Sequence, residues 1–396
     1  MAPLTQAEEA SISASILQEL SETPYACSSL TQLTGGTANF VYRGNLARPF
    51  PANDGLTIAK TVIIKHSTAF AAINPDFPLD ITRCTIEQSI LEAVARYSPP
   101  FSSTVKIKTP NLYLFSPQTN TQVIQDFPET TDLKSVLFSR NISQLLPPPS
   151  AEVLGRHLGS WLRSFHTWAS SSLAKSTMRA TIGRTDRPMR QLKRSITYDS
   201  ILTVLENYPE LLVGHEGTLT EIRDVMGREF GRPPRCGEDE EDIEWGIIHG
   251  DFWSGNVLLP DHNNTLRDEE GNNNRLFVID WEFAQYGHRA YDLGQMIGDL
   301  YEREVFNGND TAMHVMRGVI EGYGEMSDEM AFRVAIHAGV HLVGWYNRRP
   351  RSGALVAPRE VIVAGLMIGR DLILKGWARD RESFEDSVLA GLFAAK

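Results

Sequence analysis

Short apolar runs alternate with turn residues over the first third of the chain, and this pattern predicts a β-rich region. Residues 30–46, "LTQLTGGTANFVYRGNL", predict a strand, a glycine turn and a second strand. Residues 56–67, "LTIAKTVIIKHS", predict a further strand that is rich in Ile and Val. Residues 80–100, "DITRCTIEQSILEAVARYSPP", place apolar side chains on one helical face until a double proline ends the helix. Residues 105–127 predict a hairpin with its turn in "SPQTN".

The pattern changes after "LPPPSAEV" at 146–153. Residues 151–168 carry apolar side chains at helical spacing, and helices are predicted again from about residue 290 onward. Two short apolar strands lie between these regions, at 256–260 and 276–281. A β-rich part followed by a mainly helical part predicts an α+β fold.

Two charged segments interrupt the helical part. Residues 175–194, "KSTMRATIGRTDRPMRQLKR", are basic and lack a clear apolar stripe, so we interpret them as an exposed insertion. A lid that folds over a substrate is the alternative interpretation. Residues 231–245, "GRPPRCGEDEEDIEW", predict a solvated acidic loop.

The stretch "IIHGDFWSGNVLL" at 247–259 places a His-Gly-Asp cluster between two apolar runs. Asp251, on a short loop, can accept a proton from a hydroxyl, and Asn256 can offer its carbonyl oxygen to a magnesium ion. The next strand ends in "VIDWE", which brings Asp280 and Glu282 to the mouth of the same hairpin. Oxygen ligands beside a base predict a magnesium–phosphate site for phosphoryl transfer. An isolated "HGD" would predict only a capped turn.

Composition and charge limit the classes of function. The chain has 396 residues, of which 42% are hydrophobic and 22% are charged, as is ordinary for a globular protein large enough for two lobes. The net charge of −11 disfavours nucleic acid as a partner and is compatible with a cationic small molecule. Three cysteines without metal-ligand spacing favour a reducing compartment. Because neither a signal peptide nor a membrane span is predicted, we expect a cytoplasmic protein without a membrane partner.

The motifs "HGDFWSGN" at 249–256 and "VIDWEFAQYGHRAYDLG" at 278–294 resemble those of the aminoglycoside phosphotransferase, choline kinase and methylthioribose kinase family of small-molecule kinases. The order of the surrounding elements is similar too, so the resemblance covers most of the chain. "LTGGTANFVYRG", "DFWSGNVLL" and "DWEFAQYG" are similar, at the level of the branch, to fungal hydroxytryptamine kinase. The resemblance implies a protein-kinase-like two-lobe fold, with a nucleotide-binding N-lobe at 1–127. The C-lobe at 128–396 would carry the catalytic loop, the metal site and the substrate pocket.

The resemblance also implies a reaction. The protein would use ATP and Mg²⁺ to transfer the γ-phosphate to a hydroxyl of a small molecule, either an amine-bearing alcohol or a sugar. Asp251 would be the catalytic base, Asp280 the principal metal ligand and Asn256 the second. Glu282 would be an outer-shell or second-metal group. Two alternatives are a non-catalytic nucleotide-binding protein and a protein kinase, although a protein kinase would need HRD, DFG and APE segments.

The N-lobe of such a kinase needs a phosphate-covering loop and a strand lysine. "LTGGTANFVY" stands between the first two strands, where exposed N–H groups can face phosphate oxygens, although it departs from GxGxxG. Lys65 closes the strand "TVIIK" and is expected to contact the α- and β-phosphates, while Lys60, before the apolar run, is its competitor. The candidate loop residues are Gly35, Gly36, Thr37 and Asn39.

A helix glutamate should hold this lysine, and a hinge should bind adenine. "TRCTIEQSILEA" offers Glu87 and Glu92, and similarity to the methylthioribose kinase pattern favours Glu87. "TQVIQDF" supplies the hinge strand. The carbonyl of Gln125 and the N–H of Phe127 are the expected partners of adenine.

Two residues near the catalytic motif are expected to be structural. His249 should brace the loop by hydrogen bonding to nearby backbone or to a carboxylate, because Asp251 is better placed to take a proton. Asp292, in "YDLG", should bond the loop backbone from the following helix.

The acceptor is expected to bind against the C-terminal helices, where the candidate pocket residues are Trp281, Asp299, His341 and Trp345. A pocket with one acidic and several aromatic members suits an aryl amine or a quaternary ammonium through cation–π contact. The alternatives are that Trp345 belongs to the core and that Asp299 is a solvated helix residue. The sequence leaves the identity of the acceptor and the oligomeric state open.

Overall fold

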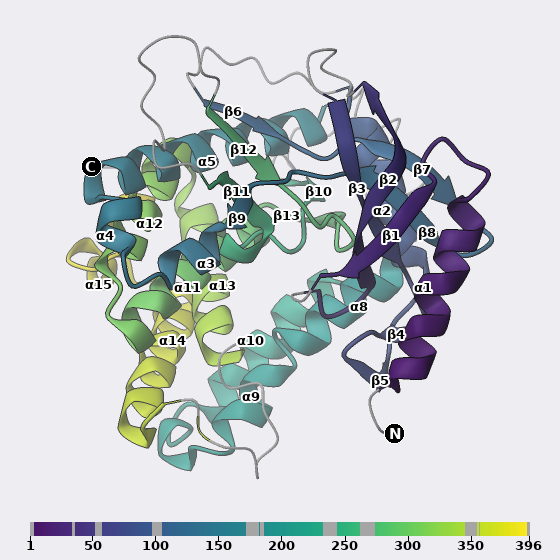
Figure 1. Cartoon of the computed structure of the whole chain (residues 1–396). Coiled ribbons are helices and arrows are strands. Elements are labelled where there is room, and N and C mark those ends of the chain that lie inside the picture. Colours follow the sequence, from purple (N-terminus) through teal and green to yellow (C-terminus); the bar gives the residue numbers. More distant parts are fainter. Residues whose placement is uncertain are drawn as a thin grey trace. The chain divides into compact units, whose positions relative to one another are not determined.

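The chain forms two compact units in this computed structural model (Figure 1). The structure describes residues 4–33, 36–51, 58–96, 105–171, 182, 186–232, 244–261, 274–344, 355 and 357–393. The first unit contains Met1–Arg96 and Thr109–Thr130, and the second contains Tyr97–Lys108 and Thr131–Lys396. These units differ from the predicted lobes in the strand Val105–Lys108 and in the three residues after Phe127. Across the described ranges, every helix is too short or too polar to cross a membrane.

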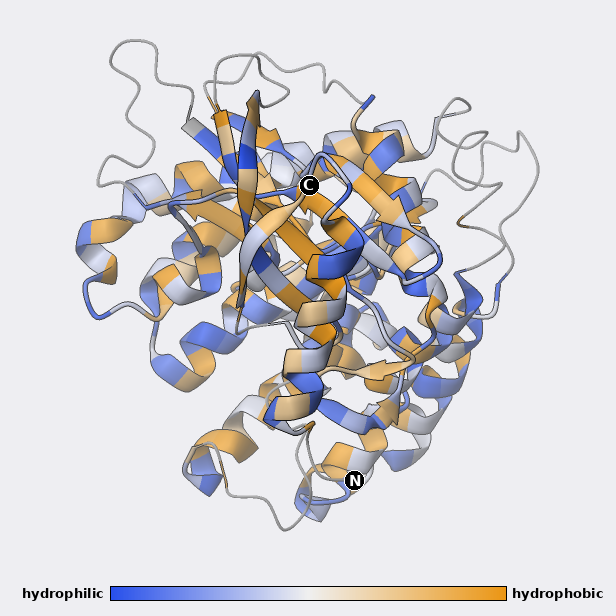
Figure 2. Cartoon of the chain, turned by 45° about the vertical axis from the view of Figure 1, so that its right-hand side comes forward, coloured by the Kyte–Doolittle hydropathy of each residue, from blue (hydrophilic) through white to orange (hydrophobic). Residues whose placement is uncertain are grey.

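The first unit is built on one five-stranded antiparallel sheet with the order β1-β2-β3-β8-β7. The strands are β1 (Cys27–Gln32), β2 (Phe40–Pro51), β3 (Ile58–His66), β7 (Leu112–Ser116) and β8 (Thr121–Gln125). A small hairpin of β4 (Phe70–Ala71) and β5 (Asn74–Pro78) follows β3, and the helices are α1 (Gln6–Leu20) and α2 (Thr82–Val94). Ile16 and Leu20 of α1 share one core with the apolar side chains of the sheet, which include Phe40, Tyr42, Val62, Ile64 and Val123. Figure 2 shows the hydrophobic residues gathered on these strands.

The predicted strand, turn and strand at 30–46 are confirmed, because β1 and β2 are antiparallel with Gln32 opposite Tyr42. The strand predicted at 56–67 is β3. The predicted helix is α2, which buries Ile86, Ile90 and Leu91 as its apolar spacing indicated.

The hairpin predicted over 105–127 is confirmed only for β7 and β8, which pair Ser116 with Thr121. It is wrong for the first four residues, because β6 (Val105–Lys108) pairs in parallel with β12 of the second unit. Pro110 explains the break. Proline has no N–H to donate and restricts the residue before it, so the chain cannot continue as one strand through "KTPN".

The second unit is mainly helical and contains two small sheets. β6, β12 (Asn274–Val278), β11 (Val257–Pro260) and β9 (Thr130–Asp132) form one sheet in that order, and β10 (Trp245–Ile248) pairs with β13 (Gln285–His288). The helices described are α3 (Leu133–Leu137), α4 (Ile142–Leu145), α5 (Pro148–Ala169), α8 (Arg187–Ile196), α9 (Ser200–Leu205), α10 (Glu216–Glu229), α11 (Ala290–Asn307), α12 (Asp310–Tyr323), α13 (Asp328–Gly344), α14 (Arg359–Ala378) and α15 (Glu382–Glu385). Short 3₁₀ turns lie at Pro209–Leu211, Ser254–Asn256 and Ala390–Leu392. A core of buried side chains joins α9, α10, α13 and α14 and includes Ile201, Ile222, Val340 and Ile373.

Helices α5 and α12 lie unusually close together because glycines face the partner backbone. A Cβ atom on Gly155 would lie 2.1 Å from the carbonyl oxygen of Val315, and one on Gly318 would lie 2.1 Å from that of Glu152. A side chain at either position would push the helices apart, since protein interiors have no spare volume. This contact fixes the helices that supply His166 and Tyr323 to the site described below.

Two antiparallel strand pairs bring the sequence motifs together. Ile248 at the end of β10 lies opposite Gln285 at the start of β13, and Val257 at the start of β11 lies opposite Val278 at the end of β12. The loop 249–256 therefore runs from one strand pair to the other, and so does the loop 279–284. As a result, the two loops lie side by side.

Candidate active site

Asp251 lies on the loop directly after β10, and Gly250 sets the shape of that loop. Gly250 has a φ of +79°, and a Cβ atom there would lie 2.0 Å from the carbonyl oxygen of Phe283. Only glycine accepts both the backbone conformation and the close approach. The Asp251 side chain that follows is 19% exposed, so its carboxylate can be reached by a small molecule.

Asp292, in the first turn of α11, fixes the backbone of this loop. Its two carboxylate oxygens accept hydrogen bonds from the N–H groups of His249 at 2.7 Å and Gly250 at 2.8 Å. His166 Nε2 of α5 lies 3.0 Å from Asp292, and His166 Nδ1 lies 2.9 Å from the hydroxyl of Tyr323 on α12. Burial opposes ionisation of Asp292, but these hydrogen bonds and nearby charges leave its pKa below the usual value. The structural role predicted for Asp292 is confirmed.

The structural role predicted for His249 is confirmed as well. Its Nε2 donates to the carbonyl oxygen of Ile279 at 3.1 Å, and its Nδ1 accepts the N–H of Asp251 at 3.3 Å. A carbonyl oxygen can only accept, so the proton must sit on Nε2 and Nδ1 is left as the acceptor. Burial lowers the pKa of His249 and favours this neutral ring. His249 therefore joins the two loops and is not arranged to transfer a proton.

Asn256 and Asp280 lie at the same end of the β11–β12 hairpin. The Ile279 N–H donates to the Asn256 carbonyl oxygen at 3.0 Å, so Asp280 follows directly after a bonded contact between the loops. Asn256 Nδ2 donates to the backbone oxygen of Asp251 at 2.9 Å. Because that oxygen can only accept, the amide orientation is fixed and Asn256 Oδ1 is directed away from Asp251.

Asp280 has a φ of +67°, in the left-handed region. Asp and Asn tolerate this region better than most non-glycine residues, and such backbone conformations concentrate at functional sites. An amide oxygen and a carboxylate on neighbouring loops match the hard oxygen ligands that Mg²⁺ and Ca²⁺ prefer. The donors present therefore fit a divalent metal ion.

Two side chains that sequence reasoning did not find hold the Asp251 carboxylate. Gln295 Nε2 of α11 donates to Asp251 Oδ1 at 2.7 Å, and Lys193 Nζ of α8 lies 3.5 Å from the same oxygen. Lys193 Nζ also donates to Gln295 Oε1 at 2.6 Å. Lys193 and Gln295 are buried, at 4% and 3% exposed.

The interpretation of 175–194 as an exposed insertion is therefore wrong for the part from 186 onward. There α8 buries Met189, Arg190 and Lys193. The buried face of α8 consists of Met189 and two long cationic side chains, so it shows no apolar stripe. The sequence feature that could have indicated this buried face is the spacing of Met189, Arg190 and Lys193, which fall on one side of a helix. Residues 175–185, except Ile182, lie outside the described residues.

In the first unit, the predicted pairing of Lys65 with Glu87 is confirmed. Lys65 Nζ lies 2.8 Å from Glu87 Oε1 and 2.7 Å from Oε2, and both side chains are buried. The competing Glu92 instead accepts a hydrogen bond from Gln88. The lysine is therefore held in place by a buried charge-assisted pair.

The glycine loop is braced by a residue that the sequence did not suggest. Arg83 of α2 is fully buried and donates to Asn39 Oδ1 at 3.0 and 3.2 Å and to the Ala38 carbonyl oxygen at 3.3 Å. Asn39 Oδ1 also accepts from Ser67 at 2.8 Å. The Thr37 carbonyl oxygen accepts the N–H of Ile73. The Asn39 side chain therefore shapes the loop from within.

Four further predicted residues, Gly35, Gly36, Gln125 and Phe127, belong to this unit. Gly36 lies at the start of the described part of the loop, and Gly35 lies outside the described residues. Gln125 accepts a hydrogen bond from Asn111 Nδ2 at 2.7 Å through its side chain. This leaves the predicted adenine contact to the backbone of Gln125 and Phe127.

The model of a family described as "Phosphotransferase enzyme family" matches residues 130–332, just over half of the chain. The chain is also 32% identical, over 402 residues, to the phosphotransferase FrzJ of Cladobotryum sp., and 98% of each sequence is covered. The chain belongs to the phosphotransferase enzyme family. The strands and helices described above confirm the predicted α+β fold class. Membership confirms an enzyme that phosphorylates a hydroxyl group of a small molecule. A nucleotide and a divalent metal are the cofactors of such an enzyme.

Other relatives are more distant in sequence. The 4-hydroxytryptamine kinase of Psilocybe cubensis is 22% identical over 332 residues, and 80% of each sequence is covered. Among solved structures, choline kinase from Cryptosporidium parvum is 10% identical, with 95% of this chain and 97% of that chain covered and a TM-score of 0.47.

Asp299 and His341, two of the predicted pocket residues of this phosphotransferase, lie close together. Trp281, a third, lies in the core behind the loop. Trp281 is fully buried, its Nε1 donates to the Val278 carbonyl oxygen at 3.2 Å, and it packs against Phe165 and His249. Its position is that of a core residue that supports the loop. Trp345 lies outside the described residues.

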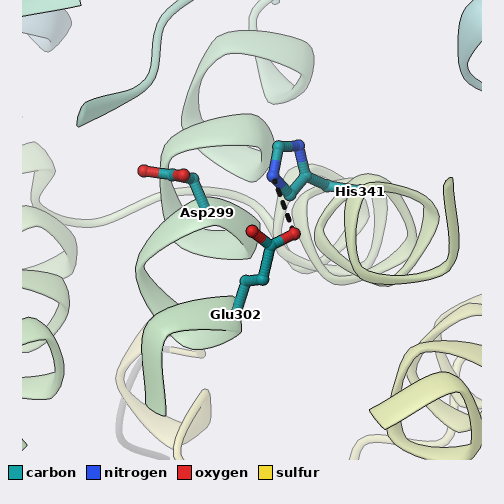
Figure 3. A group of neighbouring side chains, drawn as sticks. All are labelled: Asp299, Glu302 and His341. Atoms are coloured by element: carbon teal, nitrogen blue, oxygen red, sulfur yellow. Dashed lines mark ion pairs between the residues drawn. The ribbon is translucent and has the colours of Figure 1, made fainter. Parts of the chain in front are cut away.

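Asp299 and Glu302 of α11 and His341 of α13 form a buried group (Figure 3). Asp299 is fully buried, so the alternative of a solvated helix residue is wrong. One of its oxygens accepts the N–H of Ser254 at 3.1 Å and the other pairs with Arg303 at 2.5 Å. With both oxygens engaged and an arginine adjacent, Asp299 is placed to fix the loop 249–256 against α11.

Glu302 introduces a pH dependence of stability. Burial, reinforced by the charge of Asp299, raises its pKa to about 8 from 4.5. The folded state therefore binds more protons than the unfolded state between these values, so stability falls as the pH rises through them. One unit of pKa shift corresponds to about 1.4 kcal/mol, so ionised Glu302 costs on the order of several kcal/mol above pH 8.

We expect Glu302→Gln to remove this loss, because the amide is neutral at every pH. The melting temperatures of the variant and the parent should be similar near pH 4.5, and the variant should be the more stable protein at pH 9. Calorimetry over this range measures both. The opposite result would contradict this expectation. If the melting temperature of the parent rises above that of the variant as the pH approaches 9, the Glu302 carboxylate is stabilised in its charged form.

Proposed function

We propose that this protein transfers the γ-phosphate of ATP to a hydroxyl of a small molecule, with Mg²⁺ as the metal and Asp251 as the general base. The observation that carries the proposal is the placement of Asp251, Asn256 and Asp280 on two adjoining loops. Phosphoryl transfer depends on positioning and on neutralising phosphate charge, and this arrangement offers a proton acceptor beside two oxygen ligands.

The metal ligands in this proposal are Asp280 and Asn256. The fixed amide orientation of Asn256 supports its role, since Oδ1 is directed away from Asp251. Glu282 is buried at 4% exposure and is proposed as an outer-shell group. A bound Mg²⁺ would neutralise charge on the phosphate oxygens.

The nucleotide contacts are proposed for the first unit. Lys65 would contact the α- and β-phosphates, and the buried ion pair with Glu87 supports a fixed position of its ammonium group. Backbone N–H groups of the glycine loop would face phosphate oxygens. This part of the proposal includes Gly35, Gly36, Thr37 and Asn39, with the backbone of Gln125 and Phe127 for adenine.

The acceptor oxygen forms a bond to the γ-phosphorus while the bond from that phosphorus to the bridging oxygen of ADP breaks. Because the transition state is loose, the hydroxyl need not be ionised in advance. Asp251 orients the hydroxyl and takes its proton late, becoming a neutral carboxylic acid.

The acceptor is proposed to be an amine-bearing alcohol. The relative named 4-hydroxytryptamine kinase supports this class. His341 lines a small cavity together with Lys193 and Gln295, the two side chains that hold the Asp251 carboxylate. Its volume of about 10 Å³ has room for about one water molecule, so the acceptor itself would have to bind outside it. His341 remains a proposed acceptor contact, whereas Asp299 would act behind it through the loop.

A panel of hydroxyl compounds tests the function, with ³¹P NMR to detect the phosphate ester. The panel contains choline, ethanolamine, methylthioribose, an aminoglycoside and hydroxyindole amines. We expect a new ester and stoichiometric ADP with an amine-bearing alcohol when ATP and Mg²⁺ are present, and neither product when EDTA removes the metal. Phosphorylation of peptides in place of the panel would favour a protein kinase. ATP binding without turnover would favour a non-catalytic protein.

A further inference from the structure

Lys193 is buried beside the carboxylate that we assign as the base. Burying an ammonium group is unfavourable unless it is paired and hydrogen-bonded. Here the partners are Gln295 Oε1 at 2.6 Å and Asp251 Oδ1 at 3.5 Å, with the Phe283 ring 5.7 Å away. The phosphate and metal contacts proposed above do not use this lysine, so its position needs its own explanation.

The chemistry of the three side chains fixes their orientations. Lysine has only donors, so the oxygen of the Gln295 amide must face it. The amide nitrogen of Gln295 is then left to face Asp251, where it donates to Oδ1 at 2.7 Å. Lys193 thus acts on the carboxylate twice, directly by charge and indirectly by holding Gln295 in the donating orientation.

The two oxygens of Asp251 are consequently different. Oδ1 faces Gln295 Nε2 and Lys193 Nζ, while Oδ2 faces Asn256 Nδ2 at 3.3 Å. A carboxylate oxygen has about two acceptor positions. Oδ1 therefore faces two donors, Gln295 in a short hydrogen bond and Lys193 in a longer contact, and Oδ2 keeps the capacity to accept a further proton.

We propose that Lys193 is a positioning residue of the phosphoryl transfer, which with Gln295 anchors Asp251 Oδ1 and leaves Oδ2 as the atom that receives the acceptor's proton. The proposal rests on the role of Asp251 as the base. In this arrangement α8, from the basic segment, supplies a donor that together with Gln295 holds the carboxylate in one rotamer before the hydroxyl arrives.

The position of α8 does not depend on the charge of Lys193. Asp186 ahead of the helix accepts the N–H of Tyr286 at 2.9 Å and pairs with Arg190 at 3.1 Å. Arg190 also donates to the carbonyl oxygen of Arg232. Met189 is buried on the same face. The helix should therefore remain docked when Lys193 is replaced by Met, which has a similar length and no charge.

The test compares Lys193→Met and Gln295→Met, with Arg194→Met as the control. Arg194 is the next residue of α8. The Nε atom of its guanidinium lies 3.2 Å from Asp199 Oδ1, so this side chain has a different ionic partner from Lys193. Melting temperature and circular dichroism report the fold of each variant. The kinetic readout is ADP formation with ATP, Mg²⁺ and the panel compound that is phosphorylated fastest.

We expect Lys193→Met to lower kcat about 10- to 100-fold, in the range for a hydrogen bond to a charged group, and to leave the KM for ATP nearly unchanged. Gln295→Met should lower kcat by a smaller factor, and Arg194→Met should have no effect. A merely structural role would change the melting temperature without this separation of kcat from KM. If Lys193→Met does not fold, the proposal is tested with Gln295→Met alone. Its effect on kcat is then compared between the parent and the Asp251→Asn background.

The decisive step repeats both substitutions in an Asp251→Asn background. If they act through the carboxylate, their effects should shrink there to less than about threefold, because coupled residues are non-additive. Equal losses in both backgrounds would overturn the proposal, as would a Lys193→Met enzyme with the parent kcat. An Asp251→Asn enzyme with full activity would instead show that the proposed base is wrong.

Discussion

Replacing Asp280 by Asn or Ala is expected to lower turnover by more than about 10³-fold, because a catalytic metal contributes several kcal/mol and 1.36 kcal/mol is tenfold in rate. Asp280 stands directly after the bonded contact between Ile279 and Asn256, so its loss would remove the charged ligand of the proposed site. The fold should persist. Asn is the cleaner variant, because it tolerates the left-handed backbone at φ +67° better than Ala does.

Calorimetric titration with ATP separates a metal role from other causes. Affinity for ATP should fall in the Asp280 variants when Mg²⁺ is present and should match that of the parent when EDTA is present. Asp386→Asn, which removes an exposed carboxylate, is the matched control and should behave as the parent does. A well-folded Asp280→Asn protein that still turns over would remove the mechanism proposed here.

The predicted residues that the structure brings together are those whose positions follow from local pattern. Asp251, Asn256 and Asp280 flank short apolar strands, and the register of a hairpin is set by such patterns. The same holds for Lys65 at the end of β3 and for Glu87 on the buried face of α2. Each could be placed because the element that carries it was recognisable within a window of about 11–18 residues.

The residues that sequence reasoning missed reach the site from far along the chain. Lys193 and Gln295 are 58 and 44 residues away from Asp251, and Arg83 is 44 residues away from Asn39. No local periodicity links such pairs. Lys193 also lies in the basic segment that was interpreted as exposed, because lysine and arginine are rarely buried unless they are paired.

The predicted pocket residues show a third situation. Trp281 was placed at the acceptor because aromatic side chains suit amines, yet it lies in the core against Phe165. Asp299 of α11 and His341 of α13 belong to one buried group, yet of these two only His341 lines the cavity beside Lys193. Which side of a buried helix faces a cavity is decided by tertiary packing, and residue type alone does not reveal it.

Asp251→Asn is expected to lower kcat by about 10²–10⁴-fold, the usual contribution of a positioned general base. The KM for ATP should stay nearly unchanged, because Lys65 and the metal ligands are untouched. Steady-state kinetics at varied ATP, with the acceptor found by the panel, measures both constants. Asp386→Asn again serves as the control for the loss of one carboxylate.

The contacts of Asp251 explain why the amide cannot replace the carboxylate. Gln295 Nε2 and Lys193 Nζ both donate toward Oδ1, so the single oxygen of an asparagine must take that place. Its NH₂ group then occupies the Oδ2 position, facing Asn256 Nδ2, where the proton of the hydroxyl should arrive. The variant keeps the size and the anchoring bonds of the parent, but a donor stands where an acceptor is needed. A loss mainly in the KM for ATP, with kcat preserved, would show that Asp251 binds nucleotide or metal, and another residue would have to be the base.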